Sequence, residues 1–115
     1  MILQKIIIKK KEELSSIKKF NPNNLKPSLY NFKACLKGKH NIIAEIKKKS
    51  PSEGKYNNID VRAIVDIYNR YANAISIVTD KIFFDGDVND IKKIRDMTSL
   101  PILRKDFIID EKQIL

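Results

Sequence analysis

The spacing of apolar residues changes near residue 41, and the two parts of the chain predict different structures. Over residues 2–20, apolar side chains recur at near-helical intervals with lysines between them, which predicts an amphipathic helix. The polar residues 21–24 are expected to end that helix, and a second short helix is predicted near residues 29–37. We therefore expect residues 1–40 to form an N-terminal helical extension.

Beyond this extension, short apolar runs alternate with helical patterns. Residues 42–46, 74–78 and 101–105 are nearly continuous apolar runs, which predict buried strands. Between them, residues 61–72 and 88–97 carry apolar side chains at helical spacing. This alternation predicts a parallel sheet with right-handed crossovers, and therefore an α/β fold. Three strands with two helices leave two open sheet edges and an incompletely covered face.

Polar residues predict where these elements begin. Asp60 or Asn58 can cap the helix that follows the first strand, and Asp87 can cap the helix that follows the second. Asp110 is expected to open a third helix close to the last residue of the chain. Residues 47–58 contain proline, glycine and serine, and are expected to form a loop.

The amino-acid composition excludes several classes of protein and of metal site. The 115 residues are 43% apolar, which is enough for an ordinary core. One cysteine, Cys35, and one histidine, His40, exclude a disulfide framework and a zinc cluster of the Cys/His type, and both are interpreted as structural. No apolar run approaches the roughly 18 to 20 residues of a membrane span. A cytoplasmic location and no membrane partner are expected.

The positive charge is concentrated in the first half of the chain. The formal net charge is +9, and residues 59–115 carry slightly more acids than bases, so the excess lies in residues 1–58. One interpretation is a surface for nucleic acid or anionic lipid. The other is a compositional bias toward Ile, Lys and Asn. The second is favoured because the lysines are scattered and no aromatic residues interleave them, so no specific nucleic-acid partner is expected.

Candidate chemistry gathers at the carboxyl ends of the predicted strands. Alternation along the first strand places Glu45 and Lys47 on one face, and Lys105 ends the third strand. In parallel α/β folds this end carries the ligand site, where a lysine can bind a carboxylate or act as a general acid. The alternative is a salt bridge from Glu45 to Lys47 or Lys105 that only stabilises the rim, and spacing alone leaves both open.

Two further segments have weaker signals. Residues 47–54 could bind an anion through lysines, serines and backbone amides, but they lack the glycines of a P-loop, and no dinucleotide fingerprint follows a strand. Phe83 and Phe84 follow the second strand, where they could face an aromatic substrate or pack in the core.

Three segments carry residue motifs that are more specific than the spacing of their apolar positions. Residues 43–52 (IAEIKKKSPS), 74–80 (AISIVTD) and 101–110 (PILRKDFIID) resemble, in order, the first three strand motifs of indole-3-glycerol-phosphate synthase. That family is a (β/α)8 TIM barrel with an N-terminal helical extension. The resemblance therefore implies that residues 41–115 form about three of eight barrel strands.

The resemblance also implies an activity. Members of the family close the indole ring of 1-(2-carboxyphenylamino)-1-deoxyribulose 5-phosphate, with loss of carbon dioxide and water. The implied partner is this small phosphorylated substrate, and no metal or organic cofactor is implied, because positioned acids, bases and dipoles can carry the reaction.

By the same resemblance, individual residues acquire expected roles. Lys105 would be the general acid that protonates the substrate carbonyl, Lys47 would hold the departing carboxylate, and Glu45 would orient the lysines or the substrate amine. Three further residues match positions that line the anthranilate pocket: Ser50, Phe84 and Phe107.

The chain departs from the family at residues 81–83 and in length. Residues 81–83 are Lys, Ile and Phe, where the family has an acidic residue, a lysine and an aromatic. A complete barrel needs about 250 residues, so the second catalytic glutamate and the phosphate-binding loops are missing. We expect a truncated product, a partial sequence or one part of a split enzyme, inactive alone. The alternatives are a basic binding module and an assembly fragment that a complementary chain or fused domain completes.

Overall fold

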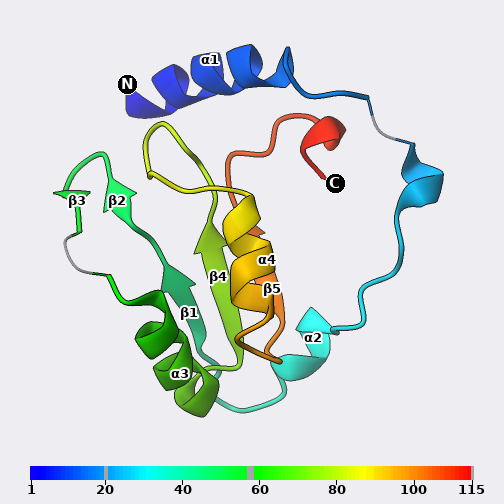
Figure 1. Cartoon of the computed structure of the whole chain (residues 1–115), viewed down its shortest axis with the longest axis vertical. Coiled ribbons are helices and arrows are strands. Elements are labelled where there is room, and N and C mark those ends of the chain that lie inside the picture. The colour runs from blue at the N-terminus through cyan, green and yellow to red at the C-terminus, as the bar shows by residue number, and fades with distance from the viewer. Residues whose placement is uncertain (20, 57–58, 115) are drawn as a thin grey trace. The chain divides into compact units, whose positions relative to one another are not determined.

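The computed structural model describes residues 1–19, 21–56 and 59–114, which group into two compact units. The larger unit, Tyr30–Asp106, contains the central sheet (Figure 1). The smaller unit combines Met1–Leu29 with Phe107–Leu115.

The central sheet has three parallel strands in the order β1-β4-β5. They are β1 (Ile43–Ile46), β4 (Ala74–Val78) and β5 (Ile102–Lys105). In this register Glu45, Ser76 and Leu103 lie side by side, so they share a face of the sheet. The predicted α/β fold with a parallel sheet is confirmed, and β1 and β5 are its two edges.

Two helices cover the other face of this sheet. They are α3 (Val61–Tyr71) and α4 (Asn89–Arg95), which follow β1 and β4 (Figure 1). The core between helices and sheet consists of Ile46, Val65, Ile75, Ile77 and Ile94, each no more than 5% exposed. On the opposite face Ile43 and Leu103, one on each edge strand, remain 45% and 42% exposed. The two helices therefore cover one face of the sheet, as the alternating pattern predicts.

The helix starts agree with the predicted capping residues in part. Asp60 caps α3, because its carboxylate accepts a hydrogen bond from the Ala63 amide at 3.1 Å. The alternative cap, Asn58, lies outside the described residues. The predicted cap of α4 is wrong by one position, since Val88 directly precedes the helix. The Asp87 carboxylate nevertheless accepts from the Asn89 amide at 2.8 Å, so it satisfies a free donor at the helix start.

Helix α4 is shorter than the predicted 88–97. It ends at Arg95, and the Met97 amide bonds to the Ile94 carbonyl at 2.9 Å, which is a tighter turn of three residues. Met97 still packs against the core, so its apolar side chain fits the predicted pattern although its backbone is not α-helical.

The start of α4 makes stability depend on pH. The hydrogen bond from the Asn89 amide, followed by the charges of Lys81 and Lys93, lowers the pKa of Asp87 below its ordinary value of 3.8. A lowered folded-state pKa contributes stability above that ordinary value, and this contribution is lost as the pH falls through the lowered value. We expect Asp87→Asn to reduce stability at neutral pH and to match the unaltered chain in strong acid. Urea unfolding of both proteins between pH 7 and about pH 2.5 measures this difference. If their free energies of unfolding differed by the same amount at every pH, the prediction would be wrong.

The prediction of a continuous loop over residues 47–58 is wrong for part of the segment. Strands β2 (Lys49–Ser50) and β3 (Gly54–Lys55) form a short antiparallel hairpin. The turn is possible because Gly54 has a φ of +74°, a conformation that glycine adopts without a steric penalty.

The predicted helix over residues 2–20 is also shorter. Helix α1 (Ile2–Leu14) ends where the Ser15 and Ser16 hydroxyls donate to carbonyls of the preceding turn, at 2.6 and 2.8 Å. Such bonds compete with continuation of the helix. The polar residues expected to end the helix form a separate 3₁₀ turn, η1 (Pro22–Asn24). Phe20 lies outside the described residues.

Two predicted short helices are present in reduced form. Helix α2 (Phe32–Cys35) confirms the helix near residues 29–37. The third helix expected at Asp110 is, in the described residues, one 3₁₀ turn, η2 (Glu111–Gln113). Asp110 caps it as predicted, since its side chain accepts from the Lys112 amide at 2.8 Å.

Residues around α2 are bound to the sheet unit. The Asn73 side chain donates to the Cys35 carbonyl at 3.2 Å, and the Arg95 guanidinium stacks over the Tyr30 ring, 3.7 Å from its centroid. The proposed division into an extension (residues 1–40) and a partial barrel (residues 41–115) stays a prediction.

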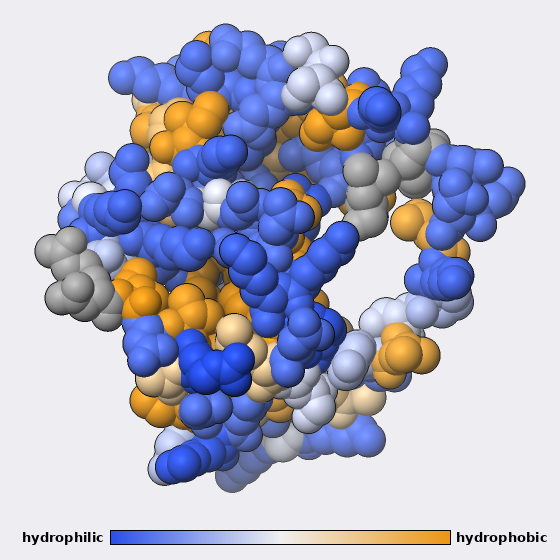
Figure 2. Space-filling model, in the orientation of Figure 1, coloured by the Kyte–Doolittle hydropathy of each residue, from blue (hydrophilic) through white to orange (hydrophobic). Residues whose placement is uncertain are grey.

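The molecular surface is mostly hydrophilic on the face drawn in Figure 2, where apolar residues form separate small patches. Among the described residues, no helix combines the length and apolar content that crossing a membrane requires.

Candidate functional site

The predicted catalytic residues of two different strands meet at one end of the sheet. The Lys105 ammonium lies 2.7 Å from a carboxylate oxygen of Glu45. These residues belong to the two edge strands, about 10 Å apart, so their side chains reach toward each other across β4. Such a contact requires the parallel register, which places Glu45 beside Ser76 and Lys105 beside Val78.

The exposure of this pair bears on what it does. The side chains of Lys105 and Glu45 are 59% and 30% exposed. An ion pair so accessible to water stabilises a fold by about 1 kcal/mol at most. An ammonium has three N–H donors, so a bond to one carboxylate leaves donors for a ligand oxygen. The arrangement can therefore hold the lysine in place while its remaining N–H donors are left for a ligand.

Lys47 is not joined to this pair. Strand β1 ends at Ile46, so the alternation that predicted a shared face with Glu45 stops one residue before Lys47. Its ammonium lies over the ring of Tyr56, 5.8 Å from the centroid. Among the described residues, no ion pair links Lys47 to Glu45. The predicted salt bridge therefore forms with Lys105.

Ser50, predicted to line the anthranilate pocket, makes a local structural contact. Its side chain is buried, and its hydroxyl oxygen accepts from the Glu53 amide at 3.1 Å, across the turn between β2 and β3. The Tyr56 hydroxyl donates to the Glu53 carboxylate, and this bond ties the same turn to the residue that follows β3. The hairpin therefore holds Ser50 at a defined position near the end of β1.

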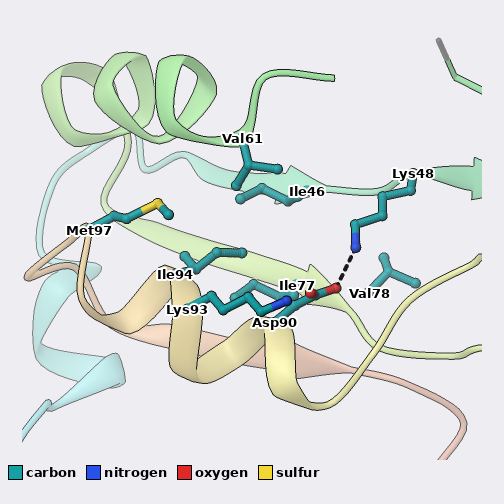
Figure 3. A pocket seen from close by; sticks show the side chains of 9 residues that line it. All are labelled: Ile46, Lys48, Val61, Ile77, Val78, Asp90, Lys93, Ile94 and Met97. Atoms are coloured by element: carbon teal, nitrogen blue, oxygen red, sulfur yellow. Dashed lines mark hydrogen bonds and ion pairs between the residues drawn. The ribbon is translucent and has the colours of Figure 1, made fainter. Parts of the chain in front are cut away.

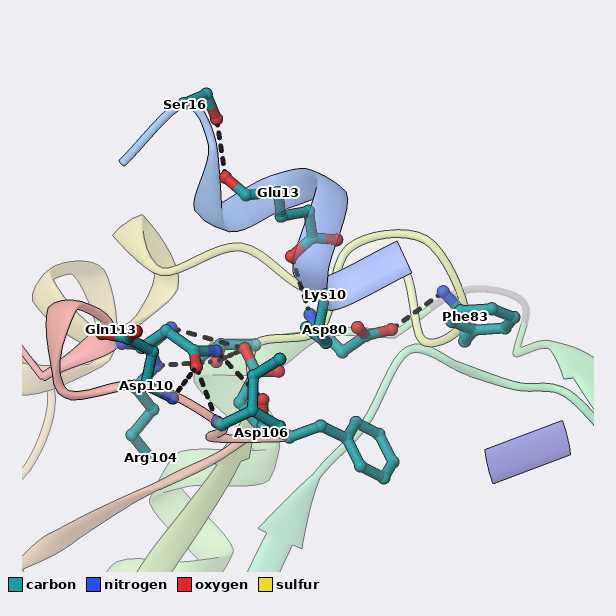
Figure 4. Close-up of polar contacts among 12 residues, drawn as sticks. Lys10, Glu13, Ser16, Asp80, Phe83, Arg104, Asp106, Asp110 and Gln113 are labelled. Atoms are coloured by element: carbon teal, nitrogen blue, oxygen red, sulfur yellow. Dashed lines mark hydrogen bonds and ion pairs between the residues drawn. The ribbon is translucent and has the colours of Figure 1, made fainter. Parts of the chain in front are cut away.

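Phe84 lies in a loop that folds back onto β4. The Asp80 carboxylate accepts from the Phe83 amide at 2.8 Å (Figure 4), and the Asp80 carbonyl accepts from the Gly86 amide at 2.7 Å. A Cβ at Gly86 would lie 2.3 Å from the Val78 carbonyl oxygen, so the close return of this loop requires glycine. Phe84 is half-buried within it.

Phe107 begins the second segment of the smaller unit, where its carbonyl accepts from the Gln113 side chain at 2.9 Å. The structure therefore brings Glu45 and Lys105 together and places Lys47 next to the adjacent hairpin.

A polar network that sequence reasoning missed holds the backbone on both sides of Lys105. Thr79 donates to the Asp106 carboxylate at 2.7 Å, and the Arg104 guanidinium donates to the Thr79 hydroxyl at 3.1 Å. Arg104 also pairs with Asp106 at 3.4 Å (Figure 4), and the Asp106 side chain is 3% exposed. Buried charges need partners, so the three consecutive charged residues 104–106 at the end of a predicted buried strand were a signal for such a network.

Ser76 is a second residue that sequence reasoning missed. Its side chain is 3% exposed on the face of Glu45, and its hydroxyl has no hydrogen-bond partner among the described residues. A buried polar group without a hydrogen-bond partner is costly, so this hydroxyl is an unsatisfied donor in the middle of β4, beside Glu45. Within the described residues, no three His, Cys, Asp or Glu side chains gather closely enough to hold a metal ion.

Comparison with known proteins assigns this chain to a family. The family model described as "Indole-3-glycerol phosphate synthase" matches residues 3–115. An indole-3-glycerol phosphate synthase of Petrotoga mobilis is 46% identical over 116 residues, which cover 99% of this chain and 43% of that protein. A synthase of the same name from Thermoanaerobacter pseudethanolicus is 42% identical, over 99% of this chain and 47% of its own.

A third relative has a different name. The tryptophan biosynthesis protein TrpCF of Buchnera aphidicola is 44% identical over 98% of this chain, but the match covers 26% of that protein. The chain thus spans less than half the length of these three relatives. The family match and the parallel sheet agree with three strands from the N-terminal part of a TIM barrel. The chain therefore belongs to the indole-3-glycerol phosphate synthase family.

Proposed function

We propose that this chain supplies the first three strands of an indole-3-glycerol phosphate synthase active site. The reaction closes the indole ring of 1-(2-carboxyphenylamino)-1-deoxyribulose 5-phosphate and releases carbon dioxide and water. The observation that carries the proposal is the Lys105–Glu45 contact at the carboxyl ends of β5 and β1. Ligand sites of parallel barrels are built at this end.

Each residue has a definite task in this proposal. Lys105 donates a proton to the substrate carbonyl while the aromatic carbon attacks it, and Glu45 holds the ammonium in place. Lys47 binds the carboxylate that leaves as carbon dioxide. Ser50, Phe84 and Phe107 line the pocket of the aromatic ring. Opposite charges held in place before the reaction lower the barrier without reorganisation.

In this proposal, further barrel strands would complete the site. Within the described residues, β1 and β5 each pair with a neighbour on one side, and Ile43 and Leu103 are exposed on the face that the two helices do not cover. A barrel completed at these edges would cover that face. It would also add the groups that bind the substrate phosphate, whose binding energy positions the reacting end.

A joined protein tests the proposal. It consists of this chain followed by the part of the Petrotoga mobilis relative that lies beyond its matched segment. We expect the joined protein to form indole-3-glycerol phosphate, measured by the fluorescence of the product, and the 115-residue chain alone to show no turnover. A folded joined protein without activity would contradict the proposed function. Steady turnover by the 115-residue chain alone would contradict the proposal that the active site also needs residues from the other barrel strands.

A further inference from the structure

An ion pair links the segment after β1 to helix α4. The Lys48 ammonium lies 2.7 Å from the Asp90 carboxylate, and these side chains are 34% and 12% exposed (Figure 3). Both residues line a cavity of about 210 Å³ between the helices and the sheet. The other lining residues are mostly apolar: Ile46, Val61, Ile77, Val78, Lys93, Ile94 and Met97.

The surroundings make this pair stronger than the exposed pairs nearby. Apolar neighbours lower the local dielectric, so the attraction between the charges is screened less than at the surface. By contrast, the ion pair from Lys55 to Asp85 has a separation of 3.6 Å and side chains 70% and 49% exposed. Removal of Asp90 would leave the Lys48 ammonium beside apolar side chains without its partner, which costs more than the loss of a surface pair.

Lys48 is also held through its backbone. Its carbonyl accepts from the Tyr56 amide at 2.9 Å, which joins it to the segment after β3. Lys48 is therefore fixed by a helix on one side and by the hairpin on the other. Lys47 directly precedes Lys48 in the chain, and Ser50 follows two residues later. The position of the Lys48 backbone therefore limits where the side chains of Lys47 and Ser50 can lie.

We propose that Asp90 is a positioning residue of the synthase reaction, which acts through Lys48 to hold residues 47–50 in their binding position. The inference rests on the proposed function, because it assigns Lys47 and Ser50 to substrate binding. Asp90 itself belongs to the helix layer and contacts no proposed catalytic group in the described residues.

Hydrogen exchange of the 115-residue chain tests the structural half. The amides of Glu53 and Tyr56 donate to Ser50 and Lys48, so they report on this segment. We expect Asp90→Asn to accelerate their exchange by about two- to tenfold, while the sheet amides of Ile75 and Thr79 exchange as before.

The matched control is Asp66→Asn, the same change at an exposed position of α3, which should alter none of these rates. Unchanged exchange at Glu53 and Tyr56 in Asp90→Asn would overturn the proposal. Equal acceleration at Ile75 and Thr79 would overturn it too, because the pair would then act on global stability alone.

Steady-state kinetics of the joined protein test the functional half. We expect Asp90→Asn to raise KM about fivefold and to change kcat less than about twofold, since the loosened segment binds the substrate rather than donating the proton. Asp90→Glu, which keeps the charge, should recover most of the lost affinity. A fall in kcat with KM unchanged would overturn the assignment. If the unaltered joined protein were inactive, the proposed function would fail, whereas the exchange experiment would still decide whether Asp90 holds the segment.

Discussion

Replacement of Lys105 by methionine is expected to reduce kcat of the joined protein by about 10²–10⁴-fold, the usual contribution of a general acid. Methionine keeps the length and the apolar stem of lysine but cannot donate a proton. Because Lys105 is 59% exposed and pairs with a partly exposed carboxylate, the substitution should have little effect on folding. The measurement is initial-rate kinetics by product fluorescence, with circular dichroism to verify the fold.

Two further variants separate proton transfer from charge. Lys105→Arg keeps the positive charge and the pairing with Glu45, but a guanidinium holds its proton too firmly to act as a general acid. It should therefore remain nearly as inactive as Lys105→Met. Lys92→Met, at an exposed position of α4, controls for the loss of one lysine and should retain full activity. Recovery of activity in Lys105→Arg would assign Lys105 an electrostatic role, and full activity of Lys105→Met would remove it from the mechanism.

Replacement of Gly86 by alanine is expected to destabilise the fold by about 3 kcal/mol or more, the upper range for added bulk in a packed site. The new Cβ would lie 2.3 Å from the Val78 carbonyl oxygen and 2.8 Å from the Thr79 backbone. These are backbone atoms of a central strand and its end, so the loop that contains Phe84 must move. The move would stretch the 2.7 Å bond from the Gly86 amide to the Asp80 carbonyl.

Gly54→Ala is the matched comparison for this substitution. A Cβ at Gly54 would meet nothing within 4 Å, although its φ of +74° is unfavourable for alanine. The expected cost is about 1–2 kcal/mol, the conformational penalty alone. Urea unfolding of both variants measures the difference. If Gly86→Ala proved no more destabilising than Gly54→Ala, the close approach of the loop to β4 would not be essential.

The elements of the sheet unit could be predicted because their local patterns agree with their environment. Residues 74–78 form a nearly continuous apolar run, and β4 is buried along its whole length between two neighbouring strands. The helical pattern of residues 61–72 places Val65 in the core and Asp60 at the cap. Errors occurred where short-range hydrogen bonds compete with the pattern, at Ser15 and Ser16 and in the hairpin around Gly54.

The candidate site was predictable only in its chemistry. A lysine and a glutamate at strand ends suggested a site or a salt bridge, and the sequence could not choose between Lys47 and Lys105 as the partner of Glu45. Asp90 lies in the first turn of α4, where the helix dipole alone already favours a carboxylate. Its contact with Lys48 joins residues 42 positions apart, and no local pattern encodes such a contact.

Element order, strand direction and the types of side chain at the strand ends follow from the chain itself, because they depend on periodicity and on interactions between near neighbours. Which charges meet depends on register across strands and on the packing of α4 against the sheet. A lysine on β5 can reach a glutamate on β1 because β4 lies between them in one parallel register. That alignment is a property of the packed sheet as a whole, so the tertiary structure decides the pairing of Glu45 with Lys105 and of Lys48 with Asp90.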